Sequence, residues 1–174
     1  CTLRNRKRAS DAELFVEYIF FPNLRIPPAA MVCGPDGYAI QVVFPKEGAE
    51  ETITEMIRIC QSWPCPPVTT VLRLHRSDDH VISFSADGYS LNFEIHPKKR
   101  HVARMREGDD ALIDCTIRHG GKVHLAKDHV LTADQFRRLF PRHVEFAAIK
   151  QRLDPEGLRS SNRFRRLFPQ IARD

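Results

Sequence analysis

The spacing of apolar residues predicts a small set of β-strands. Residues 38–44 (YAIQVVF) are apolar and rich in β-branched side chains, which predicts a largely buried strand with Gln41 as its one polar interruption. Residues 68–74 and 81–84 predict two further strands. Residues 89–95 (YSLNFEI) alternate strictly, as a strand with two different faces does. Its apolar face would hold Leu91, Phe93 and Ile95, and its polar face Ser90, Asn92 and Glu94.

Two segments between these strands show helical spacing instead. A helix is predicted to begin at residues 45–47 and to stop at Trp63-Pro64. Its inner positions would be Ile53, Met56, Ile57 and Cys60. Residues 109–119 predict a second helix, with a break or N-cap at Gly108-Asp109-Asp110. Its inner stripe would hold Ala111, Leu112, Cys115 and Thr116.

The C-terminal part of the chain is predicted to be helical. Thr132 and Gln135 fit a capping box at the start of a helix over 132–140, and Pro141 suits the first position of another helix over 141–153. The basic tail that follows interleaves arginines with Phe164, Leu167 and Phe168. RNA or membrane contact is one interpretation, but docking of the apolar side on a core is favoured, because base stacking needs aromatic residues grouped on a sheet.

The order of these elements predicts the fold class. Strand, helix, three strands, helix, short strand and terminal helices indicate an α+β fold, an antiparallel sheet with one face covered by helices. Residues 1–13 would form an N-terminal arm ahead of this domain. The chain of 174 residues is about one domain by length and long enough to bury a core.

Composition narrows the function classes. The sequence has no apolar run long enough to span a membrane, no signal peptide, and no glycine-rich phosphate loop of the dinucleotide or P-loop type. Five cysteines without CxxC spacing predict free thiols in a reducing cytoplasm rather than a disulfide framework or a zinc site. A net charge of +5 permits nucleic acid, acidic lipid or a phosphorylated ligand as partner and does not choose among them.

The stretch 120–128 (GGKVHLAKD) joins the second long helix to the terminal helices. Taken locally, a helix-to-strand turn followed by a solvated Lys127-Asp128 pair is favoured over a ligand-facing strand end. His124, Asp128 and His129 could be imagined as metal ligands, but they lack the usual ligand spacing, so no metal is predicted.

Polar residues inside the predicted strands allow two interpretations as well. The face carrying Ser90, Asn92 and Glu94 would be solvated or would line a ligand site, and the solvated interpretation is favoured when the strand is taken alone. Gln41 needs a hydrogen-bond partner within its apolar strand, either a neighbouring side chain or, with Asn92, a polar cavity.

Several motifs in order resemble one known family. The chain resembles the C-terminal part of FAD-linked oxidases of the vanillyl-alcohol-oxidase superfamily. The motifs that carry the resemblance are GGKVHLAKD, TADQFRRLFP and RLDPEGLRSS, with FFPNL, GPDGYAIQVVFP, VLRLHR and GYSLNFEI upstream of them. Within the superfamily they are most similar to the decaprenylphosphoryl-β-D-ribose oxidase branch. The histidine-tryptophan motif of the sugar-lactone branch is absent.

The resemblance implies roles for particular residues. Lys127 falls on the lysine that lies beside the flavin and the reacting hydroxyl, so it is expected to be both catalytic and cofactor-binding. The implied substrate pocket is formed by Gln41, Arg73, Ser90, Asn92 and Phe20. Four of these residues differ from that branch, which has a lysine in place of Arg73, an asparagine in place of Ser90, a cysteine in place of Asn92 and a tyrosine in place of Phe20.

The resemblance also implies a larger protein. Residues 14–128 would be the substrate (cap) domain, and 129–174 a helical segment packing towards an FAD-binding domain that precedes Cys1. FAD is expected in that parent protein and not on this chain alone. The substrate would be a polyprenyl-phosphoryl pentose, a sugar alcohol, an aldonolactone or another secondary alcohol. A cytoplasmic location is expected, with peripheral membrane association left open. Nucleic acid is not expected as a partner, although a stand-alone basic module for nucleic acid or acidic lipid is the alternative function.

Overall fold

The computed structural model describes residues 37–171, and the predictions for the N-terminal arm and Phe20 fall outside this range. The long elements are β1 (Tyr38–Pro45), α3 (Ala49–Gln61), β2 (Thr69–His75), β3 (Gly88–Ile95) and α4 (Val102–Arg118). After α4 come β4 (Lys122–Val123), the short 3-10 turn η3 (Leu125–Lys127), α5 (Ala133–Leu139), α6 (His143–Leu153) and α7 (Asn162–Leu167). A 3-10 turn, η2 (Lys99–His101), precedes α4.

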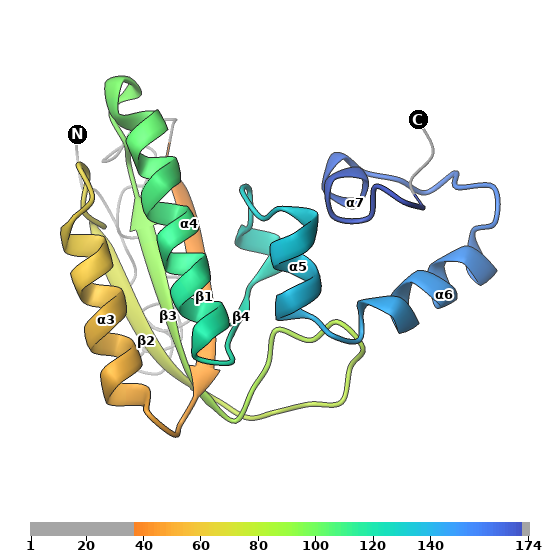
Figure 1. The fold of residues 1–174 in the computed structure, drawn as a ribbon, viewed down its shortest axis with the longest axis horizontal. Coiled ribbons are helices and arrows are strands. Elements are labelled where there is room, and N and C mark those ends of the chain that lie inside the picture. The colour runs from red at the N-terminus through yellow and green to blue at the C-terminus, as the bar shows by residue number, and fades with distance from the viewer. Residues whose placement is uncertain (1–36, 172–174) are drawn as a thin grey trace, which may run out of the picture. The chain divides into compact units, whose positions relative to one another are not determined.

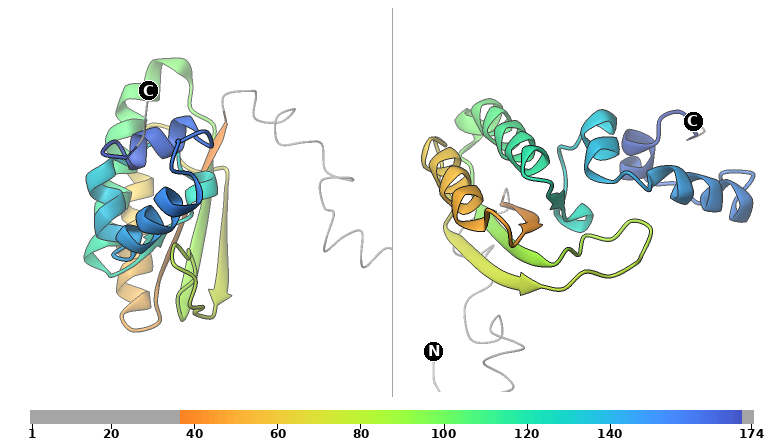
Figure 2. Two further views of the ribbon diagram at one scale, coloured as in Figure 1. Left: turned by 90° about the vertical axis from the view of Figure 1, so that its right-hand side faces the viewer. Right: turned by 60° about the horizontal axis from the view of Figure 1, so that its bottom comes forward.

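The four strands form one antiparallel sheet in the order β2-β3-β1-β4, and α3 and α4 lie together over one of its faces (Figures 1 and 2). The predicted α+β class, with an antiparallel sheet and helices on one face, is therefore confirmed. In the register, Gln41 lies opposite Asn92 and Arg73 lies opposite Ser90. Because side chains alternate along a strand, this register decides which residues share a face.

The core fills the space between the sheet and the two helices. Buried side chains from the three groups include Ile40, Val42, Phe44, Leu91, Phe93, Ile95, Met56, Cys60, Met105 and Leu112. Two predicted inner positions are wrong: Ile57 is 43% exposed and Ala111 is exposed. Ile113, which lies beside Leu112 in the sequence, is buried instead. Cys60, Cys65 and Cys115 are free thiols, as predicted.

The predicted break at Gly108-Asp109-Asp110 is wrong, because α4 runs unbroken through these residues. A Cβ atom at Gly108 would lie 2.1 Å from the indole nitrogen of Trp63. Glycine therefore lets the Trp63 ring approach the helix, which is a packing requirement and not a turn signal. Asp109 is not an N-cap either, because it lies inside α4, where its side chain is buried.

The predicted strand over 81–84 is also wrong, because these residues belong to a loop between β2 and β3. Phe84 packs with its ring centroid 5.6 Å from that of His75 and 4.7 Å from that of His124. Lys122 donates a 3.0 Å hydrogen bond to the Ser85 carbonyl in the same loop. Phe84 of this loop thus packs against side chains from β2 and from the segment after β4.

The C-terminal helices follow the predicted caps and packing. Thr132 and Gln135 form the predicted capping box of α5. Pro141, however, lies two residues before α6. Phe168 is buried and packs on Phe136 of α5 with ring centroids 5.0 Å apart, so the tail docks its apolar side, as favoured. Among residues 37–171, no helix combines the length and the apolar character needed to cross a membrane.

Candidate functional site

Polar side chains gather on the sheet face opposite α3 and α4. Because Gln41 pairs with Asn92 and Arg73 with Ser90 in the register, all four lie on this face. Gln41 and Asn92 are 4% exposed and Ser90 is fully buried, so the solvated interpretation of the strand over 89–95 is wrong. Buried polar groups of this kind need partners, which makes their contacts informative.

Lys127 reaches this face from the far edge of the sheet. Gly120 ends α4 with a φ of 65°, after which β4 pairs with β1 through Val42 and Val123. The backbone NH of His124 then donates to the Gln41 carbonyl at 2.8 Å, and η3 follows at once. At the end of η3, Lys127 Nζ donates a 2.7 Å hydrogen bond to Asn92 Oδ1.

The charge environment of Lys127 is mixed. Burial lowers the pKa of Lys127 below its ordinary value, the positive charge of Arg73 lowers it further, and Glu94 opposes the shift. Glu94 also accepts a 3.4 Å hydrogen bond from Asn92 Nδ2, so the Asn92 amide lies between an ammonium and a carboxylate. Lys127 therefore loses its proton more readily than an exposed lysine does.

A second hydrogen-bond chain crosses the same face. Gln41 Nε2 donates to Ser90 Oγ at 3.2 Å, and His75 Nε2 lies 2.8 Å from the same oxygen. An amide nitrogen can only donate, so Ser90 Oγ accepts from Gln41, and the tautomer of His75 sets the direction of the second bond. The chain thus links Ser90 with His75, and it supplies the partner that Gln41 needs.

His124 borders this group of residues. Its Nδ1 accepts a 3.2 Å hydrogen bond from the Ala126 NH, so the neutral ring carries its hydrogen on Nε2. Burial lowers the pKa of His124, and the positive charge of Lys127 lowers it further. A neutral imidazole that donates from Nε2 can hydrogen-bond a substrate oxygen.

The structure therefore brings Gln41, Ser90, Asn92 and Lys127 together, with Arg73 on the same face. The assignment of these residues to a substrate site is still a prediction. Glu94, which the alternation of residues 89–95 placed on the same face, accepts from Asn92 there. Sequence analysis missed two neighbours, His75 and His124, as site residues. Strand alternation could have found His75, which lies two residues beyond Arg73. His124 gave no such signal.

The three residues that were considered as metal ligands have separate partners. Asp128 is bound by Arg166, and His129 lies 3.7 Å from Asp109. In the described part of the chain, one group could hold an ion: Glu55, Cys115 and His119, with ligand atoms within 4.8 Å of one another. Burial raises the pKa of Cys115 to about 11, and Glu55 is already paired with Arg118 and His119. These observations favour an ion-pair cluster.

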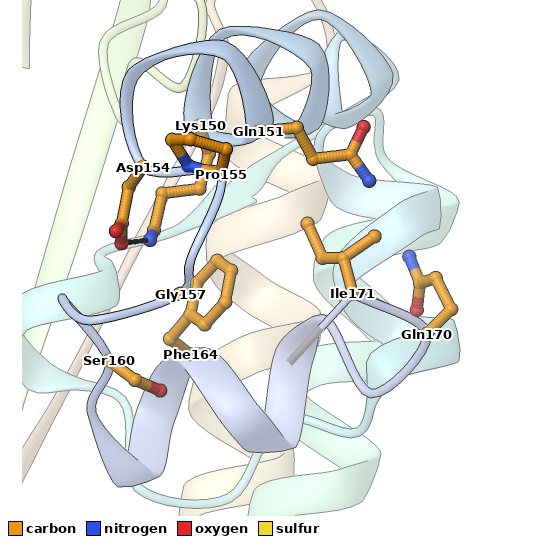
Figure 3. Close-up of a pocket in the computed structure, with 9 residues that line it drawn as sticks. All are labelled: Lys150, Gln151, Asp154, Pro155, Gly157, Ser160, Phe164, Gln170 and Ile171. Carbon is orange, nitrogen blue, oxygen red and sulfur yellow. Dashed lines mark hydrogen bonds and ion pairs between the residues drawn. The ribbon is translucent and has the colours of Figure 1, made fainter. Parts of the chain in front are cut away.

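A hollow of about 270 Å³ lies elsewhere, beside α6 and α7 (Figure 3). Lys150 and Asp154 form an ion pair on its wall, and the Lys150 ammonium lies 5.1 Å from the Phe164 ring centroid. Asp154 also accepts hydrogen bonds from the backbone NH groups of Leu158 and Arg159. The charged groups of this hollow are thus used within the chain, and none of the predicted site residues lines it.

The sequence that forms this sheet and its helices matches a described family. Residues 38–167 match the family model of D-arabinono-1,4-lactone oxidase, and the chain belongs to that family. This match confirms the resemblance to FAD-linked oxidases, and the chain therefore belongs to a family of oxidoreductases.

Named relatives are similar over much of the chain. L-gulonolactone oxidase of Bos taurus is 30% identical over 122 residues, which cover 66% of this chain and 27% of the relative. L-gulonolactone oxidase of Scyliorhinus torazame is 31% identical, over 56% of the chain and 22% of the relative. Decaprenylphosphoryl-β-D-ribose oxidase of Mycolicibacterium smegmatis is 27% identical, over 73% of this chain and 27% of the relative. The chain spans about a quarter of the length of these relatives.

Proposed function

We propose that this chain is the substrate-binding part of an FAD-dependent oxidoreductase that oxidises a hydroxyl of a sugar or sugar-like alcohol. The 2.7 Å hydrogen bond between Lys127 and Asn92 carries the proposal, because it holds a cation over a buried polar sheet face. Family membership supports the reaction class, since family and relatives are named as oxidases.

The residues present fit one end of FAD only. The Lys127 ammonium, held by Asn92, suits the ring end, where it can stabilise negative charge. The sequence has no glycine-rich loop for the pyrophosphate, so we propose that a preceding domain supplies it. When bound, the flavin would accept the hydride from the substrate carbon.

The side chains of the polar face would bind and orient the substrate. Lys127 would hold the reacting hydroxyl, and the Gln41 and Asn92 amides would hydrogen-bond neighbouring hydroxyls. Arg73 would contribute a second cation near Lys127, and the Ser90 hydroxyl would be held between Gln41 and His75. Several donors on a buried face suit a polyhydroxylated substrate, because a missing hydroxyl would leave a donor unpaired.

The substrate belongs to one of four classes: a polyprenyl-phosphoryl pentose, a sugar alcohol, an aldonolactone or another secondary alcohol. The names of the relatives include a lactone oxidase and a polyprenyl-phosphoryl sugar oxidase, so both chemistries stay in the proposal.

The test uses the reading frame extended upstream of Cys1. The purified protein is expected to show flavin absorbance, and one of the four substrate classes is expected to bleach it without oxygen. Lys127→Met is expected to slow the bleaching about 100-fold, the scale of losing one charge-stabilising group. Lys98→Met, an exposed lysine, is the matched control and should bleach at the parent rate.

Two outcomes would overturn the proposal. One is an extended protein that carries no flavin. The other is a flavin whose bleaching is unaffected by Lys127→Met. Salt-dependent binding of nucleic acid by a flavin-free protein would favour the basic-module alternative instead.

A further inference from the structure

Asp128, the residue after Lys127, carries a buried carboxylate that accepts three hydrogen bonds. Its side chain has no exposed surface. Oδ1 accepts hydrogen bonds from the backbone NH groups of Val130 and Leu131, each at 2.8 Å. Oδ2 accepts a 2.6 Å hydrogen bond from Arg166 Nη2. Both carboxylate oxygens are therefore engaged in holding nearby backbone or a distant helix.

The arginines come from α7, far along the chain. Arg163 of the same helix donates to the backbone carbonyl of Asp128 at 3.2 Å. Leu167 and Phe168, which follow Arg166, are buried, and Phe168 packs on Phe136 of α5. Two arginines and an apolar anchor thus hold α7 against the residue that follows Lys127.

We infer that Asp128 and Arg166 form a positioning pair that keeps Lys127 at the polar sheet face. Lys127 ends η3 and is followed at once by Asp128, so fixing the backbone at 128–131 fixes the point from which the lysine side chain extends. Without the pair, the four-carbon side chain would start from a mobile backbone and its bond to Asn92 would be lost. This inference rests on the proposed function for its consequence in catalysis.

A merely structural role is the competing explanation. In that case Asp128 and Arg166 would stabilise the C-terminal helices, and Lys127 would keep its environment in any folded variant. The two explanations differ in what happens to Lys127 when the pair is weakened in a folded chain. Arg166→Lys is the suitable change, because it keeps the positive charge and removes the planar fork. Arg165→Lys is the matched control, since the exposed Arg165 side chain donates to Asn162 of its own helix.

The first readout needs no flavin. In the 174-residue chain, amine modification at Lys127 is followed across pH by mass spectrometry, with Lys98 as the internal reference. In Arg166→Lys, the rate at Lys127 is expected to change by about threefold or more relative to Lys98, and its pH midpoint to rise, because leaving a buried site relieves desolvation. Arg165→Lys should leave both lysines unchanged.

The second readout uses the flavin-loaded extended protein. Arg166→Lys is expected to lower kcat about 10- to 100-fold with little change in KM, because misplacing a reacting group affects the transition state most. An unchanged Lys127 profile in a folded Arg166→Lys variant overturns the inference, and so does an equal change at Lys98. A flavin-free extended protein overturns the proposed function alone, since the first readout still decides the positioning role.

Discussion

Two buried aspartates of this chain, Asp128 and Asp109, are treated in opposite ways. Asp128 has a guanidinium on one oxygen and two backbone NH groups on the other. Asp109 is 1% exposed, receives its hydrogen bond from the Tyr38 hydroxyl at 3.0 Å, and has His129 at 3.7 Å. A buried charge is stable only with full compensation, so the first carboxylate can serve as a fixed anchor and the second cannot.

The difference shows in the titration of Asp109. Burial raises the pKa of Asp109 to about 7, and Asp110 adds to the shift, while Tyr38 and Arg106 oppose it. Near neutral pH this carboxyl is therefore part protonated. Burial also raises the pKa of Tyr38, with Asp109 adding to the effect, so the phenol keeps its hydrogen for the bond.

Removing Arg166, the cation that compensates the charge of Asp128, should have the largest effect on the free energy of unfolding. Arg166→Met leaves a buried carboxylate without its cation, which is expected to lower the free energy of unfolding by about 3 to 5 kcal/mol. Urea unfolding of the variant at pH 7 measures this loss. A change no larger than that of Arg165→Met, whose side chain is exposed, would contradict the assignment of Arg166 as the compensating group.

Neutralising Asp109 should act in the opposite direction and depend on pH. Its folded pKa lies above the unfolded value near 3.8, so the stability that protonation contributes is complete below pH 4 and is lost as the pH rises through 7. Asp109→Asn is therefore expected to stabilise the chain at pH 8, by at most about 4 kcal/mol, and to change little at pH 4.

The free energy of unfolding of Asp109→Asn and of the parent chain is measured at several pH values. Asp114→Asn, at an exposed position of the same helix, is the control. A parallel pH dependence in Asp109→Asn and the parent chain would show that Asp109 ionises as freely as a surface group.

Removing the Tyr38 hydroxyl should give a smaller effect. Tyr38→Phe deletes a hydrogen bond to the ionised carboxylate, so it is expected to cost about 1 to 2 kcal/mol at pH 8 and to raise the pKa of Asp109 further. The Asp109 carboxyl carbon shift in NMR follows this titration directly. Equal losses at pH 5 and pH 8 would contradict the bond to the charged form.

An exposed pair sets the lower end of the scale. Arg142, at the N-cap of α6, forms a two-pronged bond with Glu145 and also donates to Asp79, and all three side chains are exposed. Exposed ion pairs contribute little, so Arg142→Gln is expected to leave the urea midpoint unchanged within error. A loss comparable to that of Arg166→Met would show that burial does not explain the comparison.

Local signals were reliable where neighbouring residues decide the structure. The strand over 38–44, the alternation of 89–95 and the capping box at Thr132 and Gln135 depend on residues close in sequence, and all three are present. The apolar run at 81–84 forms no strand, and its Phe84 packs on His75 and His124 instead, which are distant in sequence. The predicted break at Gly108 was wrong because a glycine that makes room for an aromatic ring looks the same in sequence as one that ends a helix.

The candidate site divides along the same line. The motif around Lys127 and the resemblance that it carries were available from the residues alone, and the alternation already placed Ser90 and Asn92 on one face. Their burial, and the meeting of Lys127 with Asn92, depend on strand register and on β4 joining β1, which are contacts across tens of residues.

By itself, the sequence determined the α+β class, most element positions and the family, because each depends on short-range patterns and ordered motifs. Tertiary structure alone decided which polar residues are buried and how each is compensated. Asp109 and Asp128 are the same residue type, and their sequence neighbours do not show which group compensates each carboxylate. Only the fold places an arginine from α7 beside one and a tyrosine hydroxyl beside the other, because charge compensation acts through space and not along the sequence.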